Sequence, residues 1–100
     1  MDNKLLNMLG LCRRAGKLSL GFDPAVGSVI KGESGLILMA ADISAKSEKE
    51  ARFKLSEYDI DIIKLESNGA DMGAAVGKAV KIAAVCDSSF AKRIRELAVS

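Results

Sequence analysis

Two uninterrupted runs of apolar residues restrict the possible folds of this chain more than any other feature. They extend from Leu36 to Ala41 and from Ile82 to Cys86. A continuous apolar run suits a strand that is covered on both faces, whereas a half-exposed strand alternates apolar and polar residues. Both runs are far too short to cross a bilayer. They therefore predict central strands of a sheet with helices packed on either side.

Helical spacing and capping residues fill most of the remaining chain. In Asp23-Pro24, for example, aspartate is a good helix cap and proline is tolerated at the first helical position. The sequence predicts five helices, which run from Asp2 or Asn3 to Arg14, from Asp23 to Gly32, from Ala45 to Tyr58 after a Ser44 cap, from Ser67 or Asn68 onward, and from Asp87 or Ser88 onward. It predicts strands over 36–41, 60–65 and 80–86, with a short edge strand around 17–20. In the second, third and fourth helices we expect an apolar stripe that faces the core. The last residues of these stripes are Ile30, Tyr58 and Ala79.

The alternation of strands and helices defines the expected fold class. Buried strands that alternate with helices imply βαβ units with right-handed crossovers. We therefore predict an α/β protein, a three-layer α-β-α sandwich formed by residues 1–100 as a single domain. Ligands of such sheets bind at loops beyond the carboxyl ends of the strands. The loops expected there are 42–46, 66–69 and 87–89.

The absence of histidine rules out several kinds of site. The 100 residues contain no histidine, which excludes a Cys/His zinc site, a histidine general base and a Ser-His or Cys-His nucleophile pair. Residues 1–4 lead into an amphipathic pattern and do not resemble a secretory signal, and the two cysteines indicate a reducing setting. We therefore expect a cytoplasmic protein that is not an enzyme, with no cofactor, no metal and no membrane association.

Gly69, Gly73 and Gly77 form a stripe without side chains if they lie on one helix. Each glycine destabilises a helix by roughly 1 kcal/mol relative to alanine, so another interaction should compensate. Close packing against a strand or a neighbouring helix is one interpretation. Close approach of a ligand backbone, such as a ribose-phosphate chain, is the other.

Four further residues invite a chemical role but are more simply structural. Cys12 lies on the apolar face of the first helix and Cys86 ends an apolar run, where a cysteine behaves as a small hydrophobe. Asp42 and Asp87 each follow a strand, a position typical of catalytic carboxylates. Each also precedes a helix that it, or a following serine, is expected to cap.

The basic residues near predicted helix ends are Arg13, Arg14, Lys17, Lys31, Lys78 and Lys81. If these ends lie together, they form a cationic surface suited to phosphates. The alternative is a scattered, solvated set of charges. Fifteen Lys and Arg against thirteen Asp and Glu give a net charge of only +2, which does not decide between the two.

Several motifs in their order resemble one family, the L7Ae-like kink-turn-binding ribosomal proteins, and most closely its small bacterial YlxQ-type branch. The segments that carry the resemblance are Met8–Leu18, Gly21, Ala40–Ser44, Met72–Lys78 and Ala84–Ala91. The resemblance implies an α-β-α sandwich with a mixed four-stranded sheet and no catalysis. It also implies structured RNA, kink-turn-like or ribosomal, as the ligand, with a role in the ribosome or in translation and ribosomal proteins as further partners. We expect a monomer.

The family's RNA-binding helix start, Gly-x-Asn-Glu-x-x-Lys, falls on residues 21–27 and is only partly kept. Gly21 matches, whereas Asp23, Pro24 and Gly27 stand where the family has asparagine, glutamate and lysine. An aspartate accepts hydrogen bonds but cannot donate them, so it reads a guanine edge differently from asparagine. The residues expected to form the RNA surface are Lys17, Gly21, Phe22, Asp23, Lys31, Glu66, Ser67, Asn68, Met72, Gly73 and Lys78.

The departures from the family motif keep a second hypothesis open. In it the chain is a protein-interaction module of the same fold that has lost specific RNA binding. Its expected sign is an exposed apolar patch near Phe22. A third hypothesis, a small doubly wound enzyme, has no histidine and no phosphate-loop motif to support it.

Overall fold

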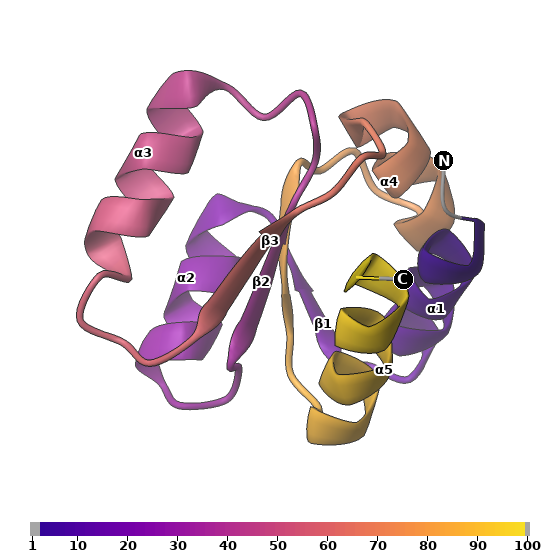
Figure 1. Ribbon diagram of the computed structural model, residues 1–100, viewed down its shortest axis with the longest axis horizontal. Coiled ribbons are helices and arrows are strands. Elements are labelled where there is room, and N and C mark those ends of the chain that lie inside the picture. The colour runs from indigo at the N-terminus through magenta and orange to yellow at the C-terminus, as the bar shows by residue number, and fades with distance from the viewer. Residues whose placement is uncertain (1–2, 100) are drawn as a thin grey trace.

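The computed structural model describes residues 3–99 and forms three layers, with a sheet between two groups of helices (Figure 1). Its elements are α1 (Asn3–Arg14), β1 (Leu18–Leu20), α2 (Phe22–Ile30), β2 (Leu36–Met39), α3 (Ala45–Lys54), β3 (Asp61–Lys64), α4 (Gly69–Val76), β4 (Ile82–Val85) and α5 (Ser88–Val99). Helices α1, α4 and α5 cover one face of the sheet, and α2 and α3 cover the other (Figure 1). The predicted α/β sandwich is confirmed.

The four strands form one mixed sheet in the order β1-β4-β2-β3. Strand β4 runs antiparallel to both of its neighbours, whereas β2 and β3 are parallel. Strands β1, β2 and β3 therefore end, and β4 begins, at the same edge of the sheet, which is the upper edge in Figure 1. We name this the upper edge, and the opposite one, where β4 ends, the lower edge. The mixed four-stranded sheet that the family resemblance implied is confirmed.

The core consists of two apolar clusters, one on each side of the sheet. All four residues of β2 and all four of β4 are buried, as the uninterrupted apolar runs predicted. Leu38 of β2 packs in the cluster under α1, α4 and α5, and Ile37 packs in the cluster under α2 and α3. Helix α1 packs closely on α4 at Gly10, where an added Cβ would lie 3.0 Å from the carbonyl oxygen of Ala75.

Strand β3 differs from the prediction of a third buried strand. It is an outermost strand of the sheet, with a neighbour on one side only, and its residues are exposed or half-buried throughout. Its sequence, Asp61-Ile62-Ile63-Lys64, places charges at both ends, and an edge strand exposes part of its backbone to solvent. The expected short strand near 17–20 is confirmed as β1, which is the outermost strand on the opposite side of the sheet.

Several helix ends also differ from the sequence-based expectation. Helix α3 ends at Lys54, so Tyr58 lies beyond it and is exposed. Ile30, at the end of α2, is 53% exposed, and Ala79 is exposed beyond the end of α4. Tyr58 and Ala79 therefore lie beyond the helices whose inward stripes they were expected to continue, and Ile30 is the last residue of α2.

Helix caps account for most of the predicted boundaries. Ser44 caps α3 by accepting a hydrogen bond from Ser47 N at 3.1 Å. Asp87 caps α5 by accepting from Phe90 N at 2.9 Å. Gly32 follows α2 with φ +77°, a conformation that favours glycine. The expected Asp2 cap of α1 lies outside the described residues, and Asn3 is already helical.

Candidate nucleic-acid interface

The register of the sheet decides which of the expected ligand loops lie together. Loops 42–46 and 66–69 follow the parallel strands β2 and β3, so both lie at the upper edge. Loop 87–89 follows β4, which runs in the opposite direction, so it lies at the lower edge and the prediction that it joins the other two is wrong. Its place at the upper edge is taken by the loop that precedes β4, residues 77–81.

The first turn of α2 lies beside the start of β4 at the upper edge. Gly21 N donates to Ile82 O at 3.0 Å, and Gly21 O accepts the first intrahelical hydrogen bond from Ala25 N. Gly21 is therefore the N-cap of α2, so the predicted cap at Asp23 is wrong. The φ of Gly21 is +95°, which side chains rarely tolerate.

Asp23 and Pro24 occupy the first turn of α2, both exposed to solvent. Proline is tolerated there because the first four N–H groups of a helix have no intrahelical partner. The N–H groups of Phe22 and Asp23 precede the first intrahelical bond, so they are available to an anion. The start of α2 thus offers two backbone donors next to the loop that leads into β4.

The loop 77–81 folds back over α4, and two glycines make this close approach possible. An added Cβ at Gly69 would lie 2.8 Å from Lys81 Cγ, and one at Gly73 would lie 3.2 Å from Lys78 O. Gly77 has a different role, because it ends α4 in the left-handed conformation with φ +80°. The glycine stripe therefore packs on the chain's own following loop, where we expected a strand or a neighbouring helix.

Asp42 joins three segments at the upper edge. Its Oδ1 accepts from Gly69 N at 2.7 Å, and its Oδ2 lies 3.7 Å from Lys81 Nζ. The hydrogen bond from Gly69 N holds the pKa of the Asp42 carboxyl below its usual value, and Lys81 adds to this effect. Asp42 thus fixes the start of α4 and the loop 77–81 relative to β2.

The sequence reasoning missed this role of Asp42. An aspartate two residues before a serine cap is ordinarily assigned to the helix that follows it. The available signal was that Ser44 already supplied a cap for α3, which left the Asp42 carboxylate without a local task.

The expected residues 66–68 follow β3 and are held by their backbone and caps. Asn68 caps α4 by accepting from Asp71 N at 2.8 Å, and Ser67 O accepts from Ala41 N at 2.8 Å. Ser67 is buried, whereas Glu66 and Asn68 are exposed. Of these three, only Glu66 and Asn68 present side chains at the surface.

Phe22 and Met72 were expected at the RNA surface, but both side chains are at least partly buried. Phe22 is the first residue of α2 and is half-buried against the cluster under α2 and α3, with Lys54 Nζ 5.5 Å from its ring centroid. The Met72 side chain is completely buried beneath α4, so it belongs to the core. Gly73 is half-buried, and Lys78 is exposed on the loop 77–81.

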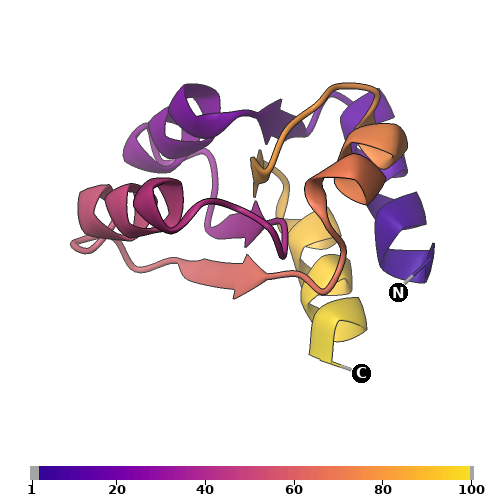
Figure 2. The same cartoon turned by 90° about the horizontal axis from the view of Figure 1, so that it is seen from above.

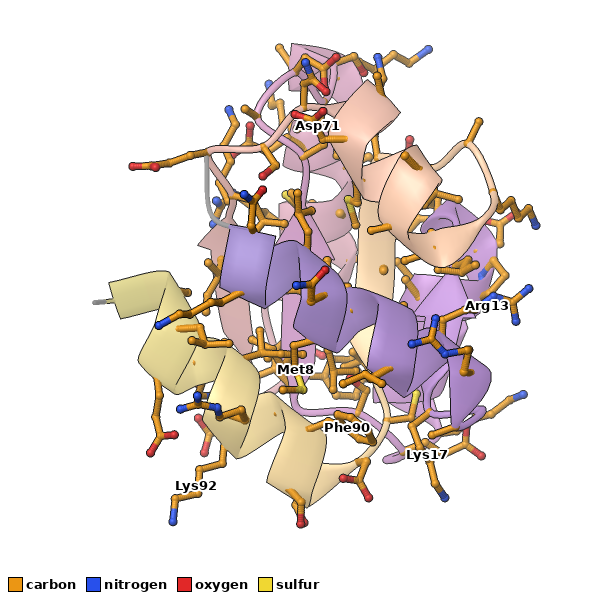
Figure 3. The ribbon with its side chains drawn as sticks, turned by 90° about the vertical axis from the view of Figure 1, so that its right-hand side faces the viewer. Met8, Arg13, Lys17, Asp71, Phe90 and Lys92 are labelled. Atoms are coloured by element: carbon orange, nitrogen blue, oxygen red, sulfur yellow. The ribbon has the colours of Figure 1, made fainter. Side chains whose placement is uncertain are left out.

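Lys17 and Lys31 do not lie with the other expected site residues. Lys17 precedes β1 and accepts a hydrogen bond from Cys86 N at 2.8 Å through its carbonyl, which places it at the lower edge. Lys31 ends α2 and also lies toward that edge, since α2 begins at the upper edge. The possibility of one cationic surface formed by all six basic residues is therefore excluded by the topology. Figure 3 shows Lys17 at the bottom of the molecule and Asp71, at the start of α4, at the top.

Together these elements define a small α/β protein whose upper edge brings a glycine-started helix next to a folded-back loop (Figure 2). A profile of the ribosomal protein L7Ae/L30e/S12e/Gadd45 family matches residues 3–94, nearly the whole chain. The chain belongs to this family.

Individual relatives agree with the family match. RNA-binding protein YlxQ of Enterococcus faecium is 31% identical over 94 residues, which cover 94% of this chain and 90% of that protein. Large ribosomal subunit protein eL30 of Methanothrix thermoacetophila is 30% identical, with 84% of this chain and 82% of that protein covered. A solved structure of a protein of unknown function from Bacillus halodurans is 28% identical and superimposes with a TM-score of 0.87, covering 97% of this chain and 98% of the other. The identification of a YlxQ-type member of the L7Ae-like family is thereby confirmed.

Proposed function

We propose that this protein binds structured RNA at the upper edge of its sheet, catalyses no reaction and acts in the ribosome or in translation. The observation that carries the proposal is the hydrogen bond from Gly21 N to Ile82 O, which joins the open first turn of α2 to the segment entering β4. A relative of this chain is named an RNA-binding protein and another a large ribosomal subunit protein. The same proposal makes the protein a cytoplasmic monomer with ribosomal proteins as neighbours.

The upper edge offers two kinds of contact to an RNA. The N–H groups of Phe22 and Asp23 can bind a phosphate at the positive end of α2, and Lys78 can add a charge contact. Beside them lies a shallow hollow lined by Gly69, Ala70, Ala79, Val80 and Lys81. Such a mostly apolar hollow suits an unstacked base, which folded RNA supplies and a straight duplex does not. Glu66 and Asn68 are exposed on the segment between β3 and α4 and can contact base edges.

The same arrangement disfavours the protein-interaction module. That hypothesis expected an exposed apolar patch near Phe22. The Phe22 ring is half-buried against the α2–α3 cluster and lies beneath Lys54 Nζ. The Phe22 ring therefore does not form the exposed apolar patch that this hypothesis expected.

The first experiment compares a kink-turn RNA with a straight duplex of matched length by fluorescence anisotropy at two salt concentrations. We expect tighter binding of the kink-turn RNA at both salts. Lys78→Glu should weaken that binding roughly tenfold or more, because it reverses a phosphate contact. The matched control is Lys49→Glu, which reverses an exposed lysine on α3 that forms no ion pair within the described residues. Equal effects of the two reversals would remove loop 77–81 from the site.

Restoring a residue of the family motif gives a second test, which asks whether the start of α2 recognises the shape of the RNA. Gly27 stands where the family has lysine, and an added Cβ at Gly27 would have no atom within 4 Å. A lysine therefore fits at position 27 without moving its neighbours. We propose that Gly27→Lys strengthens binding of the kink-turn RNA more than of the straight duplex.

Two variants control for the other consequences of Gly27→Lys. Gly27→Ala has the same effect on helix propensity without the charge, and Ser89→Lys adds the charge at the exposed start of α5. A uniform gain for both RNAs in Gly27→Lys would show only added electrostatic attraction and would contradict a kink-turn-shaped site at α2.

A further inference from the structure

The positive charge of this chain is concentrated in its first third. Residues 3–32 contain five cations, Lys4, Arg13, Arg14, Lys17 and Lys31, and a single acid, Asp23. Residues 33–98 contain ten cations and eleven acids. The positive surplus of the described residues therefore comes from the N-terminal segment, and Asp23 lies at the upper edge, away from most of it.

Four of these cations lie toward the lower edge, at or just beyond the ends of α1 and α2, which cover opposite faces of the sheet. Arg13 and Arg14 form the last turn of α1, three residues before Lys17 at the start of β1. Lys31 is the C-cap residue of α2, and a 2.6 Å contact between Ser19 Oγ and Ser28 Oγ fixes this end of α2 alongside β1. We name Arg13, Arg14, Lys17 and Lys31 the basic cluster. Figure 3 shows Arg13 and Lys17 on the rim of the molecule with their side chains directed outward.

The cations of the basic cluster lack the acidic partners found elsewhere on the surface. Of the eleven other cations, six form ion pairs, namely Arg52, Lys54, Lys64, Lys81, Arg93 and Arg95, and five form none within residues 3–99. Within residues 3–99, no side chain of the basic cluster forms an ion pair or a hydrogen bond. All four residues are exposed. Asp87, an acid of the same edge, is already engaged as the cap of α5.

Helix stabilisation explains only part of this arrangement. A cation near a helix C-terminus stabilises the helix by about 0.3–1 kcal/mol, and α1 would gain this from one residue. A second and third cation at the same end repel the first, and this repulsion offsets the gain. An anionic partner would remove the repulsion.

We propose that the basic cluster binds the phosphate backbone of a second RNA segment, apart from the RNA held at the upper edge. This inference rests on the proposed function, since it assigns RNA as the partner of both edges. Five residue steps of extended chain separate Lys17 from Phe22, or roughly 16 Å. One phosphate cannot contact both, so the protein joins two segments of a folded RNA. Such contacts carry no sequence information and depend strongly on salt.

The test is a ternary complex. The protein is saturated with unlabelled kink-turn RNA, and a labelled straight duplex is then titrated while anisotropy is followed. We expect the duplex to bind the preformed complex, and the variant R13Q/K17Q/K31Q to bind it at least tenfold more weakly. The salt slope of duplex binding should fall by about 2–3 in this variant, near 0.7–0.9 per lost phosphate contact. The control K4Q/K49Q/K92Q removes the same charge from exposed lysines elsewhere.

The outcomes separate this inference from the proposed function. If the protein binds the kink-turn RNA but the complex takes up no duplex, the second surface is overturned and the upper edge stands. Equal weakening by the two triple variants overturns the basic cluster as a defined site. Duplex binding that depends on the basic cluster, with no preference for the kink-turn RNA, supports the second surface and overturns the upper edge. An absence of any RNA binding overturns both, and an acidic protein would then be the partner to test.

Discussion

Two glycines in helix interiors allow the same substitution to be compared in opposite surroundings. Gly27 lies within α2, and a Cβ added there meets nothing within 4 Å. Gly10 lies within α1, and a Cβ added there would be 3.0 Å from the carbonyl oxygen of Ala75 in α4. Both changes to alanine gain about 1 kcal/mol of helix propensity. Only Gly10→Ala must also force two helices apart.

The expected magnitudes follow from these two contributions. Gly27→Ala should raise the free energy of unfolding by about 1 kcal/mol, which corresponds to a rise in Tm of about 4–8 °C for a domain of this size. Overpacking typically costs about 1–3 kcal/mol, so Gly10→Ala should range from neutral to about 2 kcal/mol less stable than the parent. The gap between the two variants is therefore about 1–3 kcal/mol.

Thermal and urea unfolding followed by circular dichroism at 222 nm measure this gap. The parent and both variants should unfold in one transition with similar m-values, so that the differences reflect stability alone. If Gly10→Ala stabilises the protein as much as Gly27→Ala does, the α1–α4 contact yields without cost. The conclusion that Gly10 is present for close packing would then be wrong.

Three further perturbations test the core, the upper edge and a buried thiol. Leu38→Ala removes a fully buried side chain from a central strand and should cost about 2–5 kcal/mol of unfolding free energy, measured in urea. Asp42→Ala should destabilise the protein at pH 7, and the Tm of this variant should approach that of the parent below about pH 3.8. The reason is that the stabilisation from a lowered carboxyl pKa is lost as the pH falls through that pKa. A Tm difference independent of pH would contradict the role of the carboxylate. Burial, followed by the neighbouring Cys86 and Asp87, raises the pKa of the Cys12 thiol to about 11. The unfolded chain therefore loses this proton first, so the parent should lose stability between about pH 9 and pH 11, and Cys12→Ala should lack this contribution to the pH dependence.

The central strands and most helix starts could be predicted because their causes are local. The runs that form β2 and β4 are apolar at every position, and this composition alone predicts burial on both faces. Ser44, Asn68 and Asp87 cap the helices that directly follow them. Strand β3 was predicted at the right place, but its edge position depends on strand order. Strand order is set by packing between distant segments, and no local pattern records it.

The candidate site was only partly predictable for the same reason. Loop 87–89 was assigned to the ligand edge because it follows a strand, but β4 runs against its neighbours. Lys17 was expected in the site as a basic residue near a helix end, but it precedes β1 and therefore lies at the lower edge. One reversed strand exchanges the edges at which the loops before and after it lie. The segment 77–81 thereby comes to the upper edge and loop 87–89 leaves it. The direction of β4 therefore decides which loops lie together at the upper edge.

In the two proposals above, shape recognition and charge contacts belong to opposite edges of the sheet. At the upper edge the start of α2 keeps the glycine of the family motif but has lost its lysine at position 27, and Asp42 neutralises part of Lys81. Backbone donors and a small hollow remain there, and these respond to the geometry of an RNA more than to its charge. Four of the unpaired cations, Arg13, Arg14, Lys17 and Lys31, lie toward the lower edge. A protein built in this way should bind a folded RNA with two close segments better than it binds either segment alone, because each edge supplies what the other lacks.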